Sequence, residues 1–528
     1  MALSRLERAQ IWLLKAVMGV FFTLFRFLSS RKPDGRRLPP VSNPLLAVSA
    51  TQLARKIRRR EVSSVEVVQA YIDRIQEVNP LLNAMVKDRF AAALQEAAQV
   101  DKLIEEETGG EEVLEDRLPL LGVPLSVKEA FALQGMPYTT GVVSRRGVTA
   151  TVDSPAVALL KRAGAIPLGV TNTSELCMWL ESHNHLYGIT NNPYDLERIP
   201  GGSSGGEGSI LGGAGSVIGV GSDIGGSIRM PCFFNGIFGH KTTPGVVSNE
   251  NQYPPCSGTQ EDYLSTGPMC RYAEDLVPML KIMAGQNAEK LSLNTKVDLK
   301  KVRFFTIPDD GGTPLTSPVT NELREIQRQV VQRLEADIGV KVEEVQFPGL
   351  QYSFQIWDTY MALPDKDGKL PQPFAELMGE PGRPEWPVWE LLKWMVGKSD
   401  HTMAAIGLGI MEMSHGSKPP DPFAIEQKEK LQKEVEELLG TDGVLLYPSH
   451  PKVAPKHHHP LFRPFDFSYT GIFNTLGLPA TQCPLGLSDE GLPLGVQVVA
   501  GKMHDRLPLA VALYLEEAFG GWRDPGAN

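Results

Sequence analysis

The sequence predicts an α/β protein built around a large buried β-sheet. Short apolar stretches alternate with longer stretches of helical spacing, which indicates strands and helices that follow one another along the chain. Hydrophobic residues make up 42% of the 528 residues and charged residues 22%, as in an ordinary globular protein with a large core. We therefore expect an ordered fold over most of the chain.

The first third of the chain predicts helices followed by a strand, a helix and a second strand. Apolar residues recur at helical spacing over residues 49–79, where Ser49 and either Ser63 or Ser64 can cap helices, and again over residues 89–107. The strand, helix and strand are then expected over residues 121–127, 153–163 and 165–170.

The last third predicts aromatic-rich helices and further strands. Residues 351–414 are rich in Trp, Phe and Met, which either belong to the core or line an apolar channel or cap. Helices are expected over residues 390–396 and 422–439, strands over residues 444–448 and 494–500, and an unassigned apolar stretch lies at residues 467–476.

The N-terminal segment has the composition of a membrane anchor. Residues 11–28 read IWLLKAVMGVFFTLFRFL, with Lys15 and Arg26 as the charged exceptions, and a spanning helix needs about 20 mostly apolar residues. No small-residue cleavage site follows, which disfavours a signal peptide. We expect an uncleaved anchor helix, single-pass or monotopic, on an intracellular membrane or lipid droplet. The alternative is an amphipathic helix packed on the protein's own surface.

The charge balance and the cysteines exclude several classes of protein. The net charge is −10, although residues 1–37 carry eight Lys or Arg against two acids, so a nucleic-acid partner is not expected. The five cysteines form no CxxC pair, so they indicate neither a disulfide framework nor a zinc site. The tract His457 to His459 has no neighbouring carboxylate or cysteine, and it predicts an exposed loop. No metal and no cofactor are expected.

A glycine-rich segment presents two serines on open backbone. Twelve glycines fall within residues 201–226, and Ser203 and Ser227 are each preceded by a glycine pair. Glycine permits positive φ and close approach of the backbone, and free N–H groups in such a loop can bind an anion. A serine needs a base before it can act as a nucleophile, because its hydroxyl is hardly ionised at neutral pH.

Two general motifs compete for this segment and both fit poorly. GGSSG at residues 201–205 matches the G-x-S-x-G nucleophile elbow, but that motif requires a buried strand before the serine, and NNPYDLERIP stands there instead. Neither GxGxxG nor GxxxxGK[ST] occurs in the segment, so phosphate binding is not indicated.

The sequence resembles the amidase-signature family. The resemblance is carried by GGSSGG, GSDIGGSIRMP and GIFGHKTTPGVVS between residues 201 and 248, and by LLKRAGAIPLGVTNTSEL, STGPMCRYAEDL, GIFNTLGLPATQCPLG and GLPLGVQVVAG elsewhere. It covers about residues 49–505. One departure is GHKTTPG where GxKPTxG is commoner. The resemblance implies a large twisted mixed β-sheet covered by helices on both faces.

The resemblance also implies a Ser–cis-Ser–Lys triad. Matched residue by residue, Ser227 is the nucleophile, Ser203 the relay serine and Lys128, in GVPLSVKEAF, the base. The oxyanion hole falls on the backbone N–H groups of residues 224–227, namely Ile224, Gly225, Gly226 and Ser227. Arg229 is expected to pair with a carboxylate, and Asp223 to support the glycine loop.

Substrate and organisation follow from the same resemblance. GGSSGGEG together with the anchor is similar to the membrane-bound fatty-acid amide hydrolases, most of all their type 2 vertebrate form, which implies a long-chain lipid amide as substrate. We expect residues 1–37 to be anchor and basic flank and residues 38–528 a single catalytic domain. A homodimer is left open. The competing functions are a glutamine amidotransferase-like amidase and a non-catalytic membrane-bound scaffold.

Overall fold

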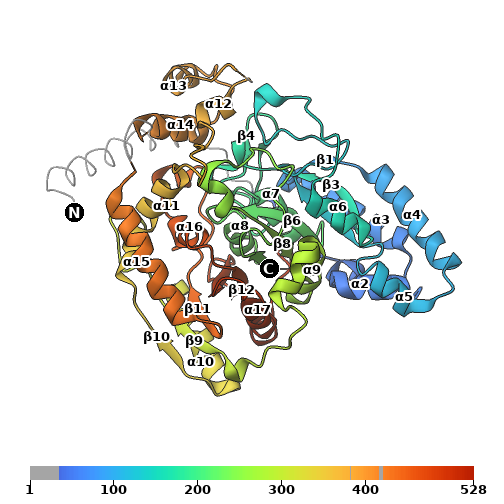
Figure 1. The fold of residues 1–528 in the computed structure, drawn as a ribbon. Coiled ribbons are helices and arrows are strands. Elements are labelled where there is room, and N and C mark those ends of the chain that lie inside the picture. Colours follow the sequence, from blue (N-terminus) through green and yellow to red (C-terminus); the bar gives the residue numbers. More distant parts are fainter. Residues whose placement is uncertain (1–34, 381, 416–419, 528) are drawn as a thin grey trace.

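The fold centres on one sheet of eleven strands. A computed structural model describes residues 35–380, 382–415 and 420–527 (Figure 1). The strand order is β1-β3-β2-β6-β8-β7-β12-β13-β11-β9-β10, and β4 and β5 form a separate pair. The strands are β1 Met85–Asp88, β2 Pro124–Lys128, β3 Ile166–Thr171, β4 His183–Asn184, β5 Gly188–Ile189, β6 Ile218–Asp223, β7 Phe238–Lys241, β8 Ser265–Cys270, β9 Arg303–Thr306, β10 Val342–Glu344, β11 Gly443–Tyr447, β12 Ala480–Leu487 and β13 Pro493–Ala500.

The chain also forms α-helices, most of which pack around this sheet. They are α2 Ala50–Arg58, α3 Ser64–Leu82, α4 Phe90–Glu106, α5 Gly110–Arg117, α6 Pro155–Arg162, α7 Gly205–Gly212, α8 Arg229–Phe234, α9 Leu276–Ala284, α10 Asn321–Arg333, α11 Ser353–Met361, α12 Phe374–Met378, α13 Pro387–Met395, α14 Met403–His415, α15 Pro422–Leu439, α16 Ser468–Thr475 and α17 Arg506–Phe519.

The sheet is mixed, as the sequence predicts. β3, β2 and β6 run parallel side by side, the central strands from β8 to β13 pair antiparallel, and β11, β9 and β10 are parallel again. Parallel strands bring their carboxyl ends to one edge, where α/β proteins commonly bind ligands. Lys128 and Asp223 are the last residues of β2 and β6, so they meet at this edge.

Helices cover both faces of the sheet. A Cβ at Gly239 of β7 would contact Cys232 of α8, whereas the next residue, His240, hydrogen-bonds Asp505 beside α17 at 3.0 Å. Successive residues of a strand point to opposite faces, so α8 and α17 lie on opposite sides. The expectation of helices on both faces is therefore confirmed.

Most predicted elements occur where the sequence places them. Ser49 accepts a hydrogen bond from the N–H of Gln52 and caps α2, while Ser63, rather than Ser64, caps α3 in a capping box with Glu66. The helix expected over residues 422–439 coincides with α15, and the unassigned apolar stretch 467–476 contains α16. The sequence reading missed β1, a strand of only four residues, Met85–Asp88, which pairs antiparallel with β3.

A small outlying unit carries α12, α13 and α14 at the top of Figure 1. Its hydrophobic cluster, which includes Met378 and Ile406, is separate from the main core, and Leu176 joins it from the loop after β3. The Glu175 carboxylate accepts a hydrogen bond from the Thr402 N–H at 2.8 Å, and His401 Nδ1 lies 2.6 Å from the same carboxylate. The unit is thus fastened to the loop that follows β3.

The predicted anchor, residues 11–28, lies outside the residues that the structure describes. Among the described helices, none is long and apolar enough to cross a membrane.

The buried central strands should dominate stability. Leu446 of β11 is fully buried, so Leu446→Ala should lower the free energy of unfolding by about 2–5 kcal/mol through lost burial and a residual cavity. Leu513 of α17 is 43% exposed, and Leu513→Ala should change it by at most about 0.5 kcal/mol. Urea denaturation of both variants checks this. Equal losses would contradict the assigned burial.

Candidate active site

Lys128 and Ser203 meet inside the protein. Lys128 is fully buried at the end of β2, and its Nζ lies 2.7 Å from Ser203 Oγ and 3.1 Å from Ser222 Oγ of β6. Burial lowers the pKa of Lys128, because the charged ammonium loses its hydration there, although Cys177, Asp223 and Glu207 oppose the shift. A neutral amine in this position can accept a proton from the Ser203 hydroxyl.

The Ser182 hydroxyl holds the loop that carries Ser203. Ser182 Oγ donates to the carbonyls of Gly201 and Ser203 at 3.1 and 3.2 Å, and it accepts from the N–H of Gly205 at 2.9 Å. The peptide bond between Gly202 and Ser203 is cis. A Cβ at Gly202 would lie 2.2 Å from the Trp179 carbonyl oxygen, so only glycine fits this close approach.

Ser227 follows β6 in a neighbouring loop. The N–H of Ser204 donates to the Ser227 carbonyl at 3.2 Å, which places the two serine-bearing loops side by side. Ser227 is 8% exposed, whereas Ser203 is 1% exposed. The more exposed of the two residues is therefore the predicted nucleophile, Ser227. The more buried one, Ser203, contacts Lys128 directly.

Asp223 organises the glycine loop. Its carboxylate accepts hydrogen bonds from the N–H groups of Gly226, Ile228 and Arg229, at 2.7, 3.1 and 3.3 Å. Within the described ranges, the N–H groups of Ile224, Gly225 and Ser227 make no hydrogen bond. Three of the four predicted oxyanion donors are thus available to a ligand, and the fourth, on Gly226, is directed at Asp223.

Side chains from two helices bind the backbone carbonyls of this loop. Trp357 Nε1 of α11 donates to the Ile224 carbonyl at 2.9 Å, and from α16 Thr470 Oγ1 donates to the Gly225 carbonyl at 2.7 Å. Because the C=O and N–H of a trans peptide point in opposite directions, the tether on the Ile224 carbonyl directs the Gly225 N–H away from Trp357. The sequence reading did not find Trp357 or Thr470, because they lie more than a hundred residues away from the loop.

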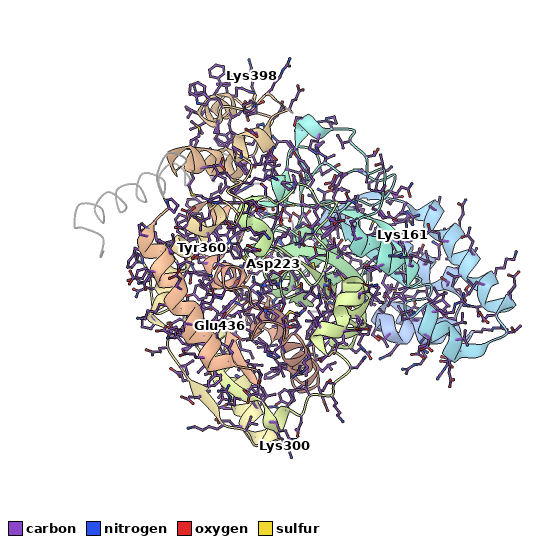
Figure 2. The ribbon with its side chains drawn as sticks, in the orientation of Figure 1. Lys161, Asp223, Lys300, Tyr360, Lys398 and Glu436 are labelled. Carbon is purple, nitrogen blue, oxygen red and sulfur yellow. The ribbon has the colours of Figure 1, made fainter. Side chains whose placement is uncertain are left out.

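A buried ion pair lies beneath the loop, close to the centre of the molecule, where Asp223 is labelled in Figure 2. Arg229 bonds both oxygens of Asp223 and also the side-chain oxygens of Asn474 and Gln497. Burial opposes ionisation of Asp223, but the charge and hydrogen bonds of Arg229 hold its pKa well below the usual range. The expected structural roles of Asp223 and Arg229 are confirmed.

Aromatic side chains crowd the same loop. The rings of Trp357 and Phe467 lie 4.7 Å apart, and those of Phe354 and Phe465 lie 4.1 Å apart. A Cβ at Gly225 would contact both Phe467 and Trp357. Trp357, from the aromatic-rich stretch 351–414, therefore contacts this loop while it is buried in the main hydrophobic core, so this part of the stretch belongs to the core and also lies beside the site.

The histidine tract is not the exposed loop that the sequence predicts. His457 Nδ1 lies 2.7 Å from Glu181 Oε1, and the His458 N–H donates to Glu181 Oε2 at 3.0 Å. Burial would raise the pKa of Glu181, but His457 and the neighbouring histidines hold it at about 2. The tract is half-buried because Glu181, 276 positions earlier, binds it. The part of the chain that the structure describes holds no cluster of metal-ligand spacing.

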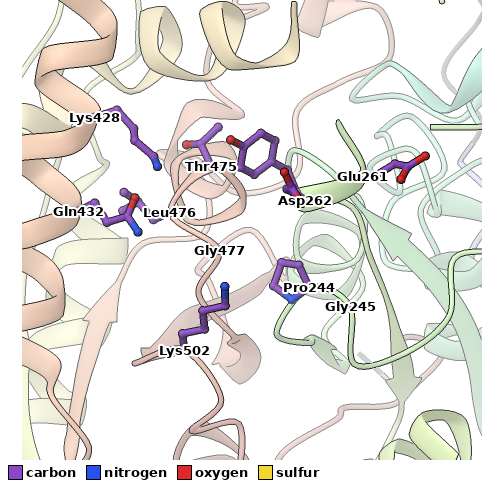
Figure 3. A pocket seen from close by; sticks show the side chains of 11 residues that line it. Pro244, Gly245, Glu261, Asp262, Lys428, Gln432, Thr475, Leu476, Gly477 and Lys502 are labelled. Atoms are coloured by element: carbon purple, nitrogen blue, oxygen red, sulfur yellow. The ribbon is translucent and has the colours of Figure 1, made fainter. Parts of the chain in front are cut away.

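A separate cavity of about 230 Å³ lies between α15, the end of α16 and the start of β8 (Figure 3). Its lining carries both signs of charge, from Lys428 and Lys502 and from Glu261 and Asp262. None of the predicted triad residues lines it, so it is distinct from the site around Lys128.

The fold and this constellation define an amidase. The chain belongs to the Amidase family, whose model matches residues 66–509.

The chain is similar over most of its length to several named proteins. The chain is 72% identical over 527 residues to "Fatty-acid amide hydrolase 2-A" of Danio rerio, covering 100% of this chain and 99% of that protein. It is 54% identical over 532 residues to "Fatty-acid amide hydrolase 2" of Homo sapiens, covering all of both. A solved structure of "Fatty acid amide hydrolase" superposes with a TM-score of 0.71 at 23% identity, covering 91% of this chain and 86% of that one.

The buried pair should be essential for stability. Asp223→Asn leaves the Arg229 charge unpaired, so the free energy of unfolding should fall by about 3–5 kcal/mol. Asp309→Asn breaks a partly exposed pair with Arg324 and should cost at most about 1 kcal/mol.

The stability that the Asp223–Arg229 ion pair contributes should also depend on pH. The pKa of Asp223 is lower in the folded protein than the value of about 3.9 in an unfolded chain, so its stabilisation is present above about pH 4 and is lost as the pH falls further. Chemical denaturation at neutral and acidic pH measures both effects. Equal losses for Asp223→Asn and Asp309→Asn would show that the pair does not hold the loop.

Proposed function

We propose that the protein hydrolyses fatty-acid amides, long-chain primary amides and N-acylethanolamines, to a free fatty acid and ammonia or an amine, with a Ser227–Ser203–Lys128 triad. The single observation that carries the mechanism is the buried amine of Lys128 at 2.7 Å from the Ser203 hydroxyl. The substrate class follows from the fatty-acid amide hydrolases that share 54 to 72% of their residues with this chain over its whole length.

The first half of the reaction adds Ser227 to the amide and forms a tetrahedral intermediate, which becomes the acyl-enzyme when the amine leaves. Neutral Lys128 takes the Ser203 proton while Ser203 takes the proton of Ser227, and Ser227 Oγ then bonds the amide carbonyl carbon. The carbonyl oxygen becomes an oxyanion, which the free N–H groups of Ile224, Gly225 and Ser227 can stabilise by about 3 kcal/mol per donor.

The second half releases the products. The relay returns a proton through Ser203 to the amide nitrogen, which leaves as an amine because an amide anion is a very poor leaving group. Water then loses a proton to the same relay, attacks the acyl carbon and frees the fatty acid and Ser227. Each proton taken by Lys128 is given back, so the triad ends each turnover unchanged.

Two other functions compete with this one. A glutamine amidotransferase-like amidase would use the same triad on a small polar substrate, and a scaffold would keep the fold without turnover. The aromatic wall of Trp357 and Phe467 over the oxyanion loop favours an apolar acyl chain over glutamine.

Membrane association is part of the proposal. Trp386, Trp389, Leu392, Met395 and Val396 are each half or more exposed on and beside α13. A contiguous apolar surface of this kind is typical of a site that meets another apolar phase. It supports docking on a membrane or lipid droplet, together with the predicted anchor in residues 1–37, and residues 38–528 remain our single catalytic domain. A homodimer stays an open expectation.

Hydrolysis of an amide panel tests the activity. Purified, detergent-solubilised protein should cleave oleamide and an N-acylethanolamine in preference to glutamine, and Ser227→Ala should lower turnover by about 10⁴-fold or more while folding is kept. Ser216, a buried serine that bonds the Ile218 carbonyl, provides the matched control, and Ser216→Ala should stay active and be labelled by a fluorophosphonate. Preference for glutamine would favour the amidotransferase, and absence of labelling the scaffold.

Vesicle flotation tests the docking surface. Trp389 and Met395 are 53% and 65% exposed, so the double variant Trp389→Glu/Met395→Glu should weaken binding to phospholipid vesicles by about tenfold or more. Turnover of a short, soluble amide should be unchanged. Leu513→Glu, at an exposed leucine on α17, is the control and should bind normally. The predicted anchor segment is removed from all three proteins, because it would bind vesicles by itself, and equal binding by them would then exclude α13 as the contact.

A further inference from the structure

Glu207 is a buried carboxyl that the mechanism above does not use. It lies in the first turn of α7, fully buried, four residues after Ser203. Its Oε2 accepts a hydrogen bond from Ser126 Oγ and its Oε1 one from Thr171 Oγ1, both at 2.7 Å. An ionised carboxyl can accept about four hydrogen bonds, and Glu207 receives these two from the described residues.

The strand registers place this carboxyl beside Lys128. Ser126 and Lys128 are two residues apart on β2, so their side chains share one face of the sheet. Thr171 of β3 pairs with Lys128, and Gly219 of β6 pairs with Ser126, which puts both on that same face. A Cβ at Gly219 would lie 2.0 Å from Glu207 Oε2, so the carboxyl occupies the space that this glycine leaves open.

The strands do not need the carboxyl to hold them together. β2 already pairs with β6 in a continuous backbone register and with β3 in a register that shifts once, between Leu125 and Ser126. Burying an ionisable group without full hydrogen bonding is costly, and a hydrophobic side chain at residue 207 would avoid that cost. Glu207 lies on the face of the sheet that also carries the Lys128 side chain, which indicates an electrostatic role.

Among the described residues, few ionisable groups lie close to Glu207 and Lys128. From the elements packed against α7, Lys128 of β2 and the buried thiol of Cys232 on α8 lie close to Glu207. Lys128 is also faced by Cys177, from the loop after β3, and by Asp223 at the end of β6. Burial raises the pKa of Glu207 to about 7, against the opposing effects of Ser126, Thr171 and Lys128.

We propose that Glu207 is a positioning residue for the base: its carboxylate raises the proton affinity of Lys128 and stabilises the ammonium that forms when Lys128 takes the relay proton. The inference rests on the proposed function, because it requires Lys128 to act as the base. No bond to Glu207 forms or breaks. The proton moves from Ser227 through Ser203 to Lys128, and Glu207 acts only through its charge.

The proposal predicts two linked kinetic changes. Removing the carboxylate makes Lys128 a weaker base, so the neutral amine survives to lower pH and the acid limb of the rate profile moves to lower pH. A weaker base also slows proton removal from the serines, which lowers the plateau at high pH. A purely structural loss would lower the rate at every pH without moving the limb.

Fluorophosphonate labelling of Ser227 as a function of pH is the test, because it reads the relay without depending on the natural amide. From about pH 5 to about pH 10, Glu207→Gln should move the midpoint of the acid limb down by about one pH unit and lower the plateau about three- to tenfold. Glu516→Gln is the matched control. Glu516 is a partly buried carboxyl of α17 whose pKa is also raised to about 7, and its replacement should leave the profile unchanged.

A second variant covers the case in which Glu207→Gln does not fold. Thr171→Val removes one donor to the carboxylate, which raises the proton affinity of Glu207, reduces its charge and should move the limb in the same direction by a smaller amount. An unmoved limb in whichever of the two variants keeps the wild-type melting temperature would overturn the proposal and leave Glu207 a structural group. Failure of the wild-type protein to be labelled at Ser227 would overturn the proposed function and this inference together.

Discussion

The burial of one amine is the constraint on which the rest of the site depends. Lys128 is fully enclosed at the end of β2, where burial lowers its pKa and makes the neutral base accessible. An enclosed amine must still find hydrogen-bonding partners, and Ser203 and Ser222 supply them from two different segments. The parallel arrangement of β3, β2 and β6 brings those segments together, so the proposed chemistry depends on the sheet topology.

The loop of residues 224–227, where we propose the oxyanion hole, is organised by a division of its backbone groups. Asp223 takes the N–H groups of Gly226, Ile228 and Arg229, and Trp357 and Thr470 take the carbonyls of Ile224 and Gly225. What remains is the N–H groups of Ile224, Gly225 and Ser227, which have no partner among the residues that the structure describes. Because these donors are fixed before a ligand arrives, they need little reorganisation when negative charge develops. Trp357, which tethers the loop, and Phe467 also place apolar rings against Gly225.

The exposed face of α13 and the site are connected through the loop after β3. Glu175 binds Thr402 and His401 at the base of the outlying unit, while Cys177, two residues later, lies beside Lys128. Burial would lower the pKa of His401, but the Glu175 carboxylate raises it above the ordinary value. The surface that we propose to meet the lipid is therefore joined to the segment that contacts Lys128.

The sequence by itself determined the α/β class and the helices α2, α3, α4, α6, α13 and α15, and its family resemblance predicted the mixed sheet and a triad of Lys128, Ser203 and Ser227. Local periodicity and an unusual glycine-serine segment carry that information because they are written in neighbouring residues. The tertiary structure decided what depends on distant residues. It showed the tethers Trp357 and Thr470, the capture of His457 by Glu181, and the carboxyl of Glu207 over the face of Lys128. These contacts arise only when strand register and helix packing bring remote side chains to one point, and no local pattern encodes them.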